Sequence, residues 1–242
     1  MKFNFTVHRY QIIFVILVFI LTGSVKIVSK GTQQPYAAMQ QRYPHSVALT
    51  FDDGPYPGGS THKLLDILEN ENVKATFFVV GSHSRKNPEL MKLIASKGHE
   101  FGGHTYNHRH IKKLTRNALL NELEITRTII KNTTGKNTYL FRPPGGQYSK
   151  KNLSDASLSG YTTVLWSVLP KDCESSTTSE DIIQNVLSNT RPNGIILLHM
   201  GRERTLEALP KIICMLRLRG FKFLTVSQMM LENRNPNENS RN

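Results

Sequence analysis

Seven strand-like runs alternate with helical patterns through most of this 242-residue chain. Strands rich in β-branched and aromatic residues are predicted at 46–53, 75–81, 99–105, 138–144, 162–168, 194–200 and 221–229. Helices are predicted from the spacing of apolar residues at 61–70, 88–97, 116–131, 151–159, 179–188 and 206–219. Strands separated by helices in this way indicate parallel βαβ units, and seven of them predict an α/β barrel.

Chemically active side chains follow the carboxyl ends of these predicted strands. In chain order they are Asp52, Asp53, His104, His108, Asp172 and His199. The carboxyl ends of the strands of a parallel barrel open on one face, where catalytic groups gather. We therefore expect these side chains to form one site.

The adjacent carboxylates of Asp52 and Asp53 repel each other unless a cation or a proton separates their roles. A simple turn is the alternative for an Asp-Asp-Gly-Pro stretch taken alone. His104 and His108 are four residues apart, a spacing that puts both imidazoles on one side of a helical turn. Two surface histidines are the alternative there. Together with Asp53 the pair would form a metal site that leaves positions open for water and substrate.

This arrangement predicts the hydrolysis of an amide or an ester. With Asp53 bound to the metal, Asp52 is free to take a proton from a water whose pKa the metal lowers. His199 approaches from the opposite wall of the barrel mouth and would protonate the leaving group.

The first 30 residues predict a signal peptide or an N-terminal membrane anchor. Basic residues precede an unbroken apolar run at 12–21, and small residues at 22–24 suit cleavage. An uncleaved anchor at 10–28 is the alternative. The protein is therefore predicted to be extracytoplasmic, either membrane-anchored or secreted to the cell wall. The further organisation predicted is a linker at 31–44, a catalytic domain at 45–231 and a flexible polar tail at 232–242.

The net charge of +13 indicates an anionic partner, which could be nucleic acid, a membrane surface or an acidic cell-wall polymer. The sequence has no nucleic-acid-binding motif, and the predicted export signal argues against nucleic acid. The two cysteines, Cys173 and Cys214, would allow one disulfide by number.

From about Ser46 to Met229 the chain resembles the polysaccharide deacetylases of carbohydrate esterase family 4, the NodB-homology domain. The motifs that carry the resemblance are T-F-D-D-G-P, H-T-Y-N-H, F-R-P-P-G-G and L-L-H, in that order. It implies a distorted (β/α) barrel with seven parallel strands. It also implies removal of acetyl groups from N-acetylhexosamine units, with peptidoglycan as the expected polymer. Chitooligosaccharide, an exopolysaccharide and O-acetylated xylan are alternatives.

The resemblance also implies a role for each matching residue. Asp52 would be the general base, and Arg142 would orient it. His199 would be the acid, and Asp172 would hold it. The ligands of a divalent metal ion, usually zinc, would be Asp53, His104 and His108. The backbone N–H of Gly145 would bind the oxyanion, and Leu197 would line the pocket for the acetyl methyl group.

The fourth family motif, typically D-x-x-D-W, reads L-P-K-D-C here. Leu169 replaces the first Asp and Cys173 replaces the Trp, which removes an aromatic wall from the acetate pocket. A weakly active barrel that binds glycans is therefore an alternative. The presence of every ligand, the base and the acid argues against it. His110 and Trp166 are expected to be structural.

Overall fold

The computed structural model describes residues 45–234. The predicted leader and linker, and residues 235–242 of the predicted tail, lie outside this range. Within residues 45–234, no helix is both apolar enough and long enough to cross a membrane.

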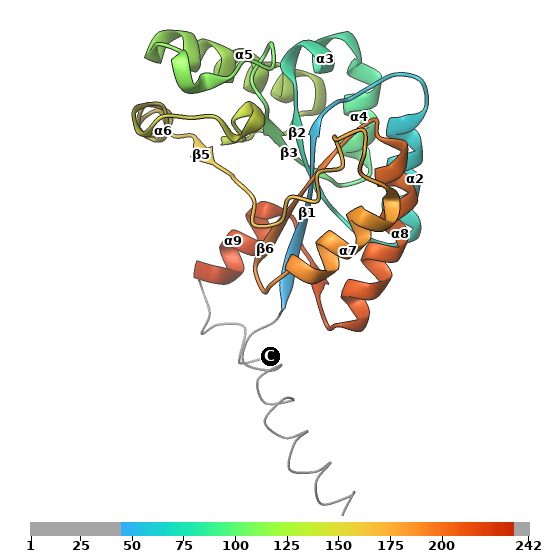
Figure 1. The fold of residues 1–242 in the computed structure, drawn as a ribbon. Coiled ribbons are helices and arrows are strands. Elements are labelled where there is room, and N and C mark those ends of the chain that lie inside the picture. The colour runs from blue at the N-terminus through green and yellow to red at the C-terminus, as the bar shows by residue number, and fades with distance from the viewer. Residues whose placement is uncertain (1–44, 235–242) are drawn as a thin grey trace, which may run out of the picture. The chain divides into compact units, whose positions relative to one another are not determined.

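Seven parallel strands form one curled sheet (Figure 1). They are β1 (Ser46–Asp53), β2 (Thr76–Val79), β3 (Glu100–Gly103), β4 (Leu140–Phe141), β5 (Thr162–Thr163), β6 (Gly194–His199) and β7 (Lys222–Phe223). The strand order is β5-β4-β3-β2-β1-β6, with β7 beside β1. The segment that follows β5 reaches β6, where Val168 pairs with Ile196. This bridge joins the two ends of the strand order, so the predicted distorted barrel with seven parallel strands is confirmed.

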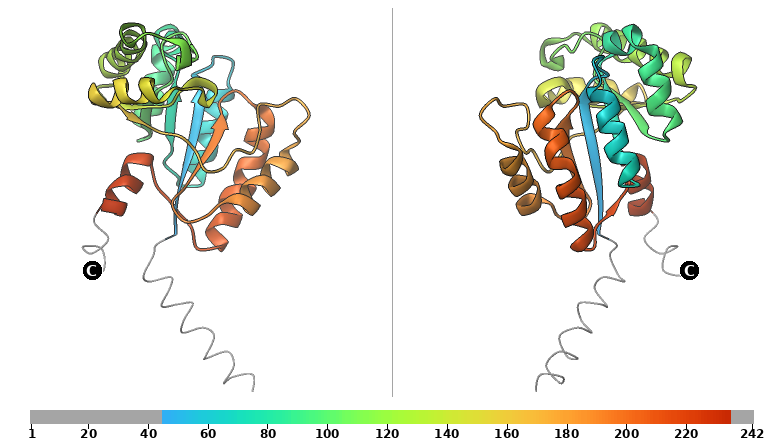
Figure 2. Two further views of the ribbon diagram at one scale, coloured as in Figure 1. Left: turned by 60° about the vertical axis from the view of Figure 1, so that its left-hand side comes forward. Right: turned by 90° about the vertical axis from the view of Figure 1, so that its right-hand side faces the viewer.

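Helices connect the strands, and a last helix follows β7 and packs against the inner face of the sheet. They are α2 (Ser60–Asn70), α3 (Gly81–Lys86), α4 (Pro88–Ser96), α5 (Arg116–Thr134), α6 (Lys150–Leu158), α7 (Ser179–Asn189), α8 (Glu203–Leu218) and α9 (Val226–Arg234), with short 3₁₀ turns η1 (Ile111–Lys113) and η2 (Pro144–Gly146). The left view of Figure 2 shows α7 and α8 on one side of β1 and α9 on the other side.

Strand β1 is buried on both faces, as a central parallel strand should be. Val47, Leu49 and Phe51 pack in the main core beneath the helices. Each such fully buried side chain contributes about 1.5–3 kcal/mol of transfer free energy. Because side chains alternate along a strand, Thr50 and Asp52 face the interior of the barrel instead. The alternation of side chains along β1 therefore directs the Asp52 carboxylate into the interior of the barrel.

The predicted strand at 221–229 is wrong after residue 223, because helix α9 begins at Val226. Val226 and Met229, one helical turn apart, pack against Ala48 and Phe78 at the inner face of the sheet. The first N–H groups of α9 are satisfied by Thr76 and by the carboxylate of Glu100. This tertiary contact overrides the strand propensity of the sequence, and residues 232–234 of the predicted tail form the last turn of α9.

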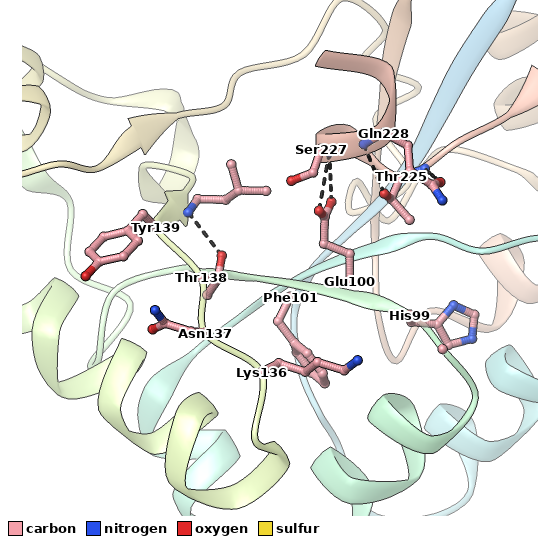
Figure 3. Close-up of a pocket in the computed structure, with 12 residues that line it drawn as sticks. His99, Glu100, Phe101, Lys136, Asn137, Thr138, Tyr139, Thr225, Ser227 and Gln228 are labelled. Carbon is pink, nitrogen blue, oxygen red and sulfur yellow. Dashed lines mark hydrogen bonds between the residues drawn. The ribbon is translucent and has the colours of Figure 1, made fainter. Parts of the chain in front are cut away.

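A polar pocket with a volume of about 380 Å³ lies at the amino ends of β3 and β4 (Figure 3). Glu100, Lys136, Tyr139 and Gln228 are among the residues that line it. Asp53 and His104 lie at the carboxyl ends of β1 and β3, at the other end of the strands. The pocket is therefore separate from the predicted site.

Candidate active site

Asp52 and Asp53 end β1 with their side chains in different environments. Asp52 is buried and stands in register with His199 on the neighbouring strand β6. Asp53 has a φ of 83°, a conformation that residues other than glycine seldom adopt. This change in backbone direction places the Asp53 carboxylate at the barrel mouth, whereas the Asp52 carboxylate stays buried.

The side chains of Asp53, His104 and His108 converge. Asp53 Oδ1 lies 3.7 Å from His104 Nε2 and 3.3 Å from His108 Nε2. One ligand atom from each residue lies within 4.8 Å of the others. Ligand atoms about 2.0–2.2 Å from a tetrahedral ion would stand roughly 3.3–3.6 Å apart. The spacing of these donors therefore fits one divalent metal ion.

Hydrogen bonding fixes the tautomer of His104. Its Nδ1 lies 2.8 Å from the carbonyl oxygen of Arg142, which can only accept, so Nδ1 carries the hydrogen and donates it. Nε2 is then left with a lone pair on the side of Asp53. Burial lowers the pKa of His104 and favours the neutral imidazole that a metal requires.

Electrostatics also favour the ionised carboxylate of Asp53, which is the form that binds a metal. Burial opposes ionisation, but the hydrogen bond with His108 and the charges of the neighbouring histidines outweigh it and lower the pKa of Asp53 to about 2. In the absence of a metal, the same hydrogen bond raises the pKa of His108. A cation would take the place of that shared proton, because it satisfies both side chains.

The predicted helical turn around the two histidines is wrong, although the pairing of their rings is as expected. The segment is a loop in which Thr105 and His108 have positive φ values of 59° and 55°. The ring centroids of His104 and His108 lie 5.0 Å apart. Glu122, buried on α5, holds the loop by accepting the backbone N–H groups of the two residues after Thr105, each at 2.8 Å. No sequence signal pointed to Glu122.

Arg142 is completely buried and holds Asp52 in place. Its Nη1 donates to Asp52 Oδ1 at 2.7 Å and to Thr50 Oγ1 at 2.8 Å. Nε and Nη2 donate to backbone carbonyls at 3.2 Å, and the guanidinium lies 4.2 Å from the centre of the Phe78 ring. The free oxygen of Asp52, Oδ2, lies 3.7 Å from His104 Nε2 and thus faces the metal cluster.

Replacing Arg142 with Met should lower the free energy of unfolding by about 3–5 kcal/mol, because it leaves Asp52 as a buried charge without its partner. Urea denaturation measures the loss. Arg109→Met is the matched control, since Arg109 is exposed and lies 3.8 Å from Glu122. Equal stability of the two variants would contradict this role for Arg142.

His199 is held by Asp172 through two contacts. Asp172 Oδ1 lies 2.7 Å from His199 Nδ1, while Oδ2 accepts the His199 backbone N–H at 2.8 Å and the Thr205 hydroxyl at 2.7 Å. Burial lowers the pKa of His199, but the hydrogen bond and charge of Asp172 outweigh it and leave the pKa raised. Nδ1 is engaged, so Nε2 is the nitrogen that can exchange a proton.

Of the remaining predicted residues, Gly145 follows β4 and Leu197 lies on β6. Gly145 lies in η2 with a φ of 60°, and a Cβ there would come within 3.0 Å of His110. Leu197 is buried on β6, two residues before His199 and on the same face. Leu169 is exposed, and Cys173 and Cys214 are exposed free thiols.

His110 and Trp166, which were expected to be structural, lie next to the site. The ring centroid of His110 lies 6.4 Å from that of His108, and its Nδ1 lies 3.2 Å from the Pro144 carbonyl oxygen. Trp166 is half-buried, with the Arg142 guanidinium 5.8 Å from its ring centre. In the sequence, only the position of His110 two residues after His108 indicated that it lies near the site.

Residues 40–164 match the family model for polysaccharide deacetylase. The chain belongs to the polysaccharide deacetylase family. A peptidoglycan-N-acetylglucosamine deacetylase of Bacillus cereus is 37% identical over 189 residues, covering 76% of this chain and 87% of the relative.

Solved structures of polysaccharide deacetylases share the fold. The Bc1960 peptidoglycan N-acetylglucosamine deacetylase superimposes with a TM-score of 0.73 and 36% identity, covering 76% of this chain and 87% of the other. A CE4 family pseudoenzyme from Bacillus anthracis has a TM-score of 0.71 and 27% identity, covering 78% of this chain and 66% of the other. The family thus contains both enzymes and a pseudoenzyme, so the residues of each site decide its activity.

Proposed function

We propose that this member of the polysaccharide deacetylase family is a metal-dependent hydrolase that removes N-acetyl groups from the N-acetylhexosamine units of peptidoglycan. The observation that carries the proposal is the cluster of Asp53, His104 and His108 beside the buried Asp52–Arg142 pair. The Bacillus cereus relative supports peptidoglycan as the substrate.

Asp53, His104 and His108 would hold the metal, for which we propose zinc, because two imidazoles and one carboxylate are a common catalytic zinc set. When bound, the ion polarises the acetyl carbonyl and lowers the pKa of water. Asp52 is positioned to take the proton of the attacking water through Oδ2, since Arg142 engages Oδ1.

His199 would donate a proton to the sugar nitrogen as the carbon–nitrogen bond breaks, which yields acetate and a free amine. Asp172 keeps the ring oriented and stabilises its charged form. We further propose that the backbone N–H of Gly145 binds the developing oxyanion and that Leu197 contacts the acetyl methyl group.

Replacing Asp172 with Asn should move the alkaline limb of the kcat/KM profile to lower pH. Asp172 raises the pKa of His199, so the acid stays protonated to higher pH, and removing the carboxylate lets it lose its proton earlier. Activity at the parent optimum should fall by at least about 10-fold. The pH profile of acetate release measures both effects. A merely structural Asp172 would lower the rate without moving that limb.

The proposed substrate is tested by incubating the purified protein and zinc with peptidoglycan, N-acetylglucosamine oligomers and O-acetylated xylan, and measuring the acetate released. Fastest release from peptidoglycan would support the proposal. Preference for another polymer would contradict the substrate and leave the chemistry intact.

The unusual fourth motif and the pseudoenzyme neighbour favour a second candidate, a barrel that binds glycans without hydrolysing them. Binding of the same polymers with no acetate release would establish it. The complete set of base, acid and metal ligands favours the enzyme.

For location, we propose an extracytoplasmic protein, anchored or secreted through its N-terminal segment. The basic composition would favour contact with anionic wall polymers. Cell fractionation would test the location, and recovery of the protein only in the cytoplasm would contradict it.

A further inference from the structure

A second group of possible metal ligands lies beside the first. It consists of Asp172, Cys173 and His199, with one ligand atom of each within 4.8 Å of the others. Cys173 is an exposed free thiol, whereas Asp172 is buried. The group is therefore open to solvent on its sulfur side and fixed to the barrel on its carboxylate side.

The chemistry of this group differs from that of the Asp53 cluster. It offers a thiol, an imidazole and a carboxylate, a set typical of zinc and of softer thiophilic ions. The Asp53 cluster contains no sulfur. A tryptophan at position 173, the residue typical of the motif that this chain resembles, would offer no ligand.

We propose that Asp172, Cys173 and His199 form a second, inhibitory site for a thiophilic divalent cation, represented by Zn²⁺ or Cd²⁺. On binding, the thiol gives its proton to solvent and the thiolate coordinates the ion. His199 and Asp172 then become ligands, so the imidazole no longer delivers a proton to the sugar nitrogen. The inhibitory effect rests on the function proposed above, but the binding does not.

The two sites should fill in a fixed order. Asp172 and His199 are already hydrogen bonded to each other at 2.7 Å, and an ion at the second site must compete with that bond. At the first site the contact to be displaced is longer, 3.3 Å between Asp53 Oδ1 and His108 Nε2, and the imidazole lone pair of His104 already lies on the side of Asp53. The first equivalent of metal therefore activates, and the second inhibits.

Cadmium binding tests the site without using activity. The full-length parent, Cys173→Ser and Cys214→Ser are each dialysed against Cd²⁺, and both bound metal and cadmium–thiolate absorbance are measured. Cys214 is the matched control because it is also an exposed free thiol, on α8. We expect two ions and the thiolate absorbance in the parent and in Cys214→Ser. Cys173→Ser should lose the absorbance and bind the second ion at least about 10-fold more weakly.

A single bound ion in the parent, or unchanged binding of the second ion in Cys173→Ser, would overturn the proposed second site.

A zinc titration of acetate release then tests inhibition, and each variant is compared with its own maximum activity. The parent and Cys214→Ser should decline beyond one equivalent, and Cys173→Ser should not. Cysteine-dependent binding in a protein that never releases acetate would refute the proposed hydrolase while confirming the second site. Cysteine-dependent binding with no decline in an active protein would overturn the inhibitory role.

Discussion

The Asp52→Asn variant is expected to lower kcat for acetate release by about 10²–10⁴-fold, the usual contribution of a general base. Asp52 faces the metal cluster with one oxygen and is held by Arg142 through the other. The amide of Asn keeps the size of the side chain but cannot take a proton from water. Metal binding should be unchanged, because Asp52 is not among the three clustered ligands.

The control for this variant is Asp66→Asn, since Asp66 is exposed on α2 and lies 4.0 Å from Lys97. Asp52→Asn also removes the charge that balances the buried Arg142, so its thermal unfolding is measured alongside and the assays are run where both variants are folded. A folded Asp52→Asn protein with more than about a tenth of the parent activity would refute the assignment of Asp52 as the base.

Replacing His108 with Ala should remove most of the metal affinity and, with it, the activity. His108 Nε2 lies 3.3 Å from Asp53 Oδ1 and is half-exposed, so its removal leaves the core intact. We expect metal binding to weaken by at least about 100-fold, since losing a ligand should cost at least as much as losing one of its hydrogen-bonding partners. Bound zinc, measured after dialysis, is the readout.

His62→Ala serves as the comparison, because His62 is exposed on α2 and is not among the clustered metal ligands. An unchanged affinity for the first zinc ion in His108→Ala would contradict the predicted ligand set.

The place of the site could be predicted because the carboxyl ends of all strands in a parallel barrel lie on one face. A run such as that ending in Asp52 specifies a buried strand, and the polar residues after it must lie at its carboxyl end. The predicted neighbourhood of Asp53, His104 and His108 followed from this rule and is the arrangement the structure shows.

Other features could not be predicted because they depend on contacts between distant residues. The loop that brings His104 and His108 together is held by Glu122, which lies on a different helix. Helix α9 replaces most of a predicted strand because Glu100 and the inner face of the sheet stabilise its start. The short distance from Cys173 to His199 also arises only from the folded loop.

The central claim is that one metal ion at the Asp53 cluster enables the surrounding residues to release acetate. It is tested most directly by stripping the protein with a chelator and titrating zinc while acetate release from peptidoglycan fragments is followed. We expect no release without metal and a rise that ends at one equivalent. Release from the metal-free protein, or one tightly bound ion with no release from any acetylated polymer, would contradict the claim.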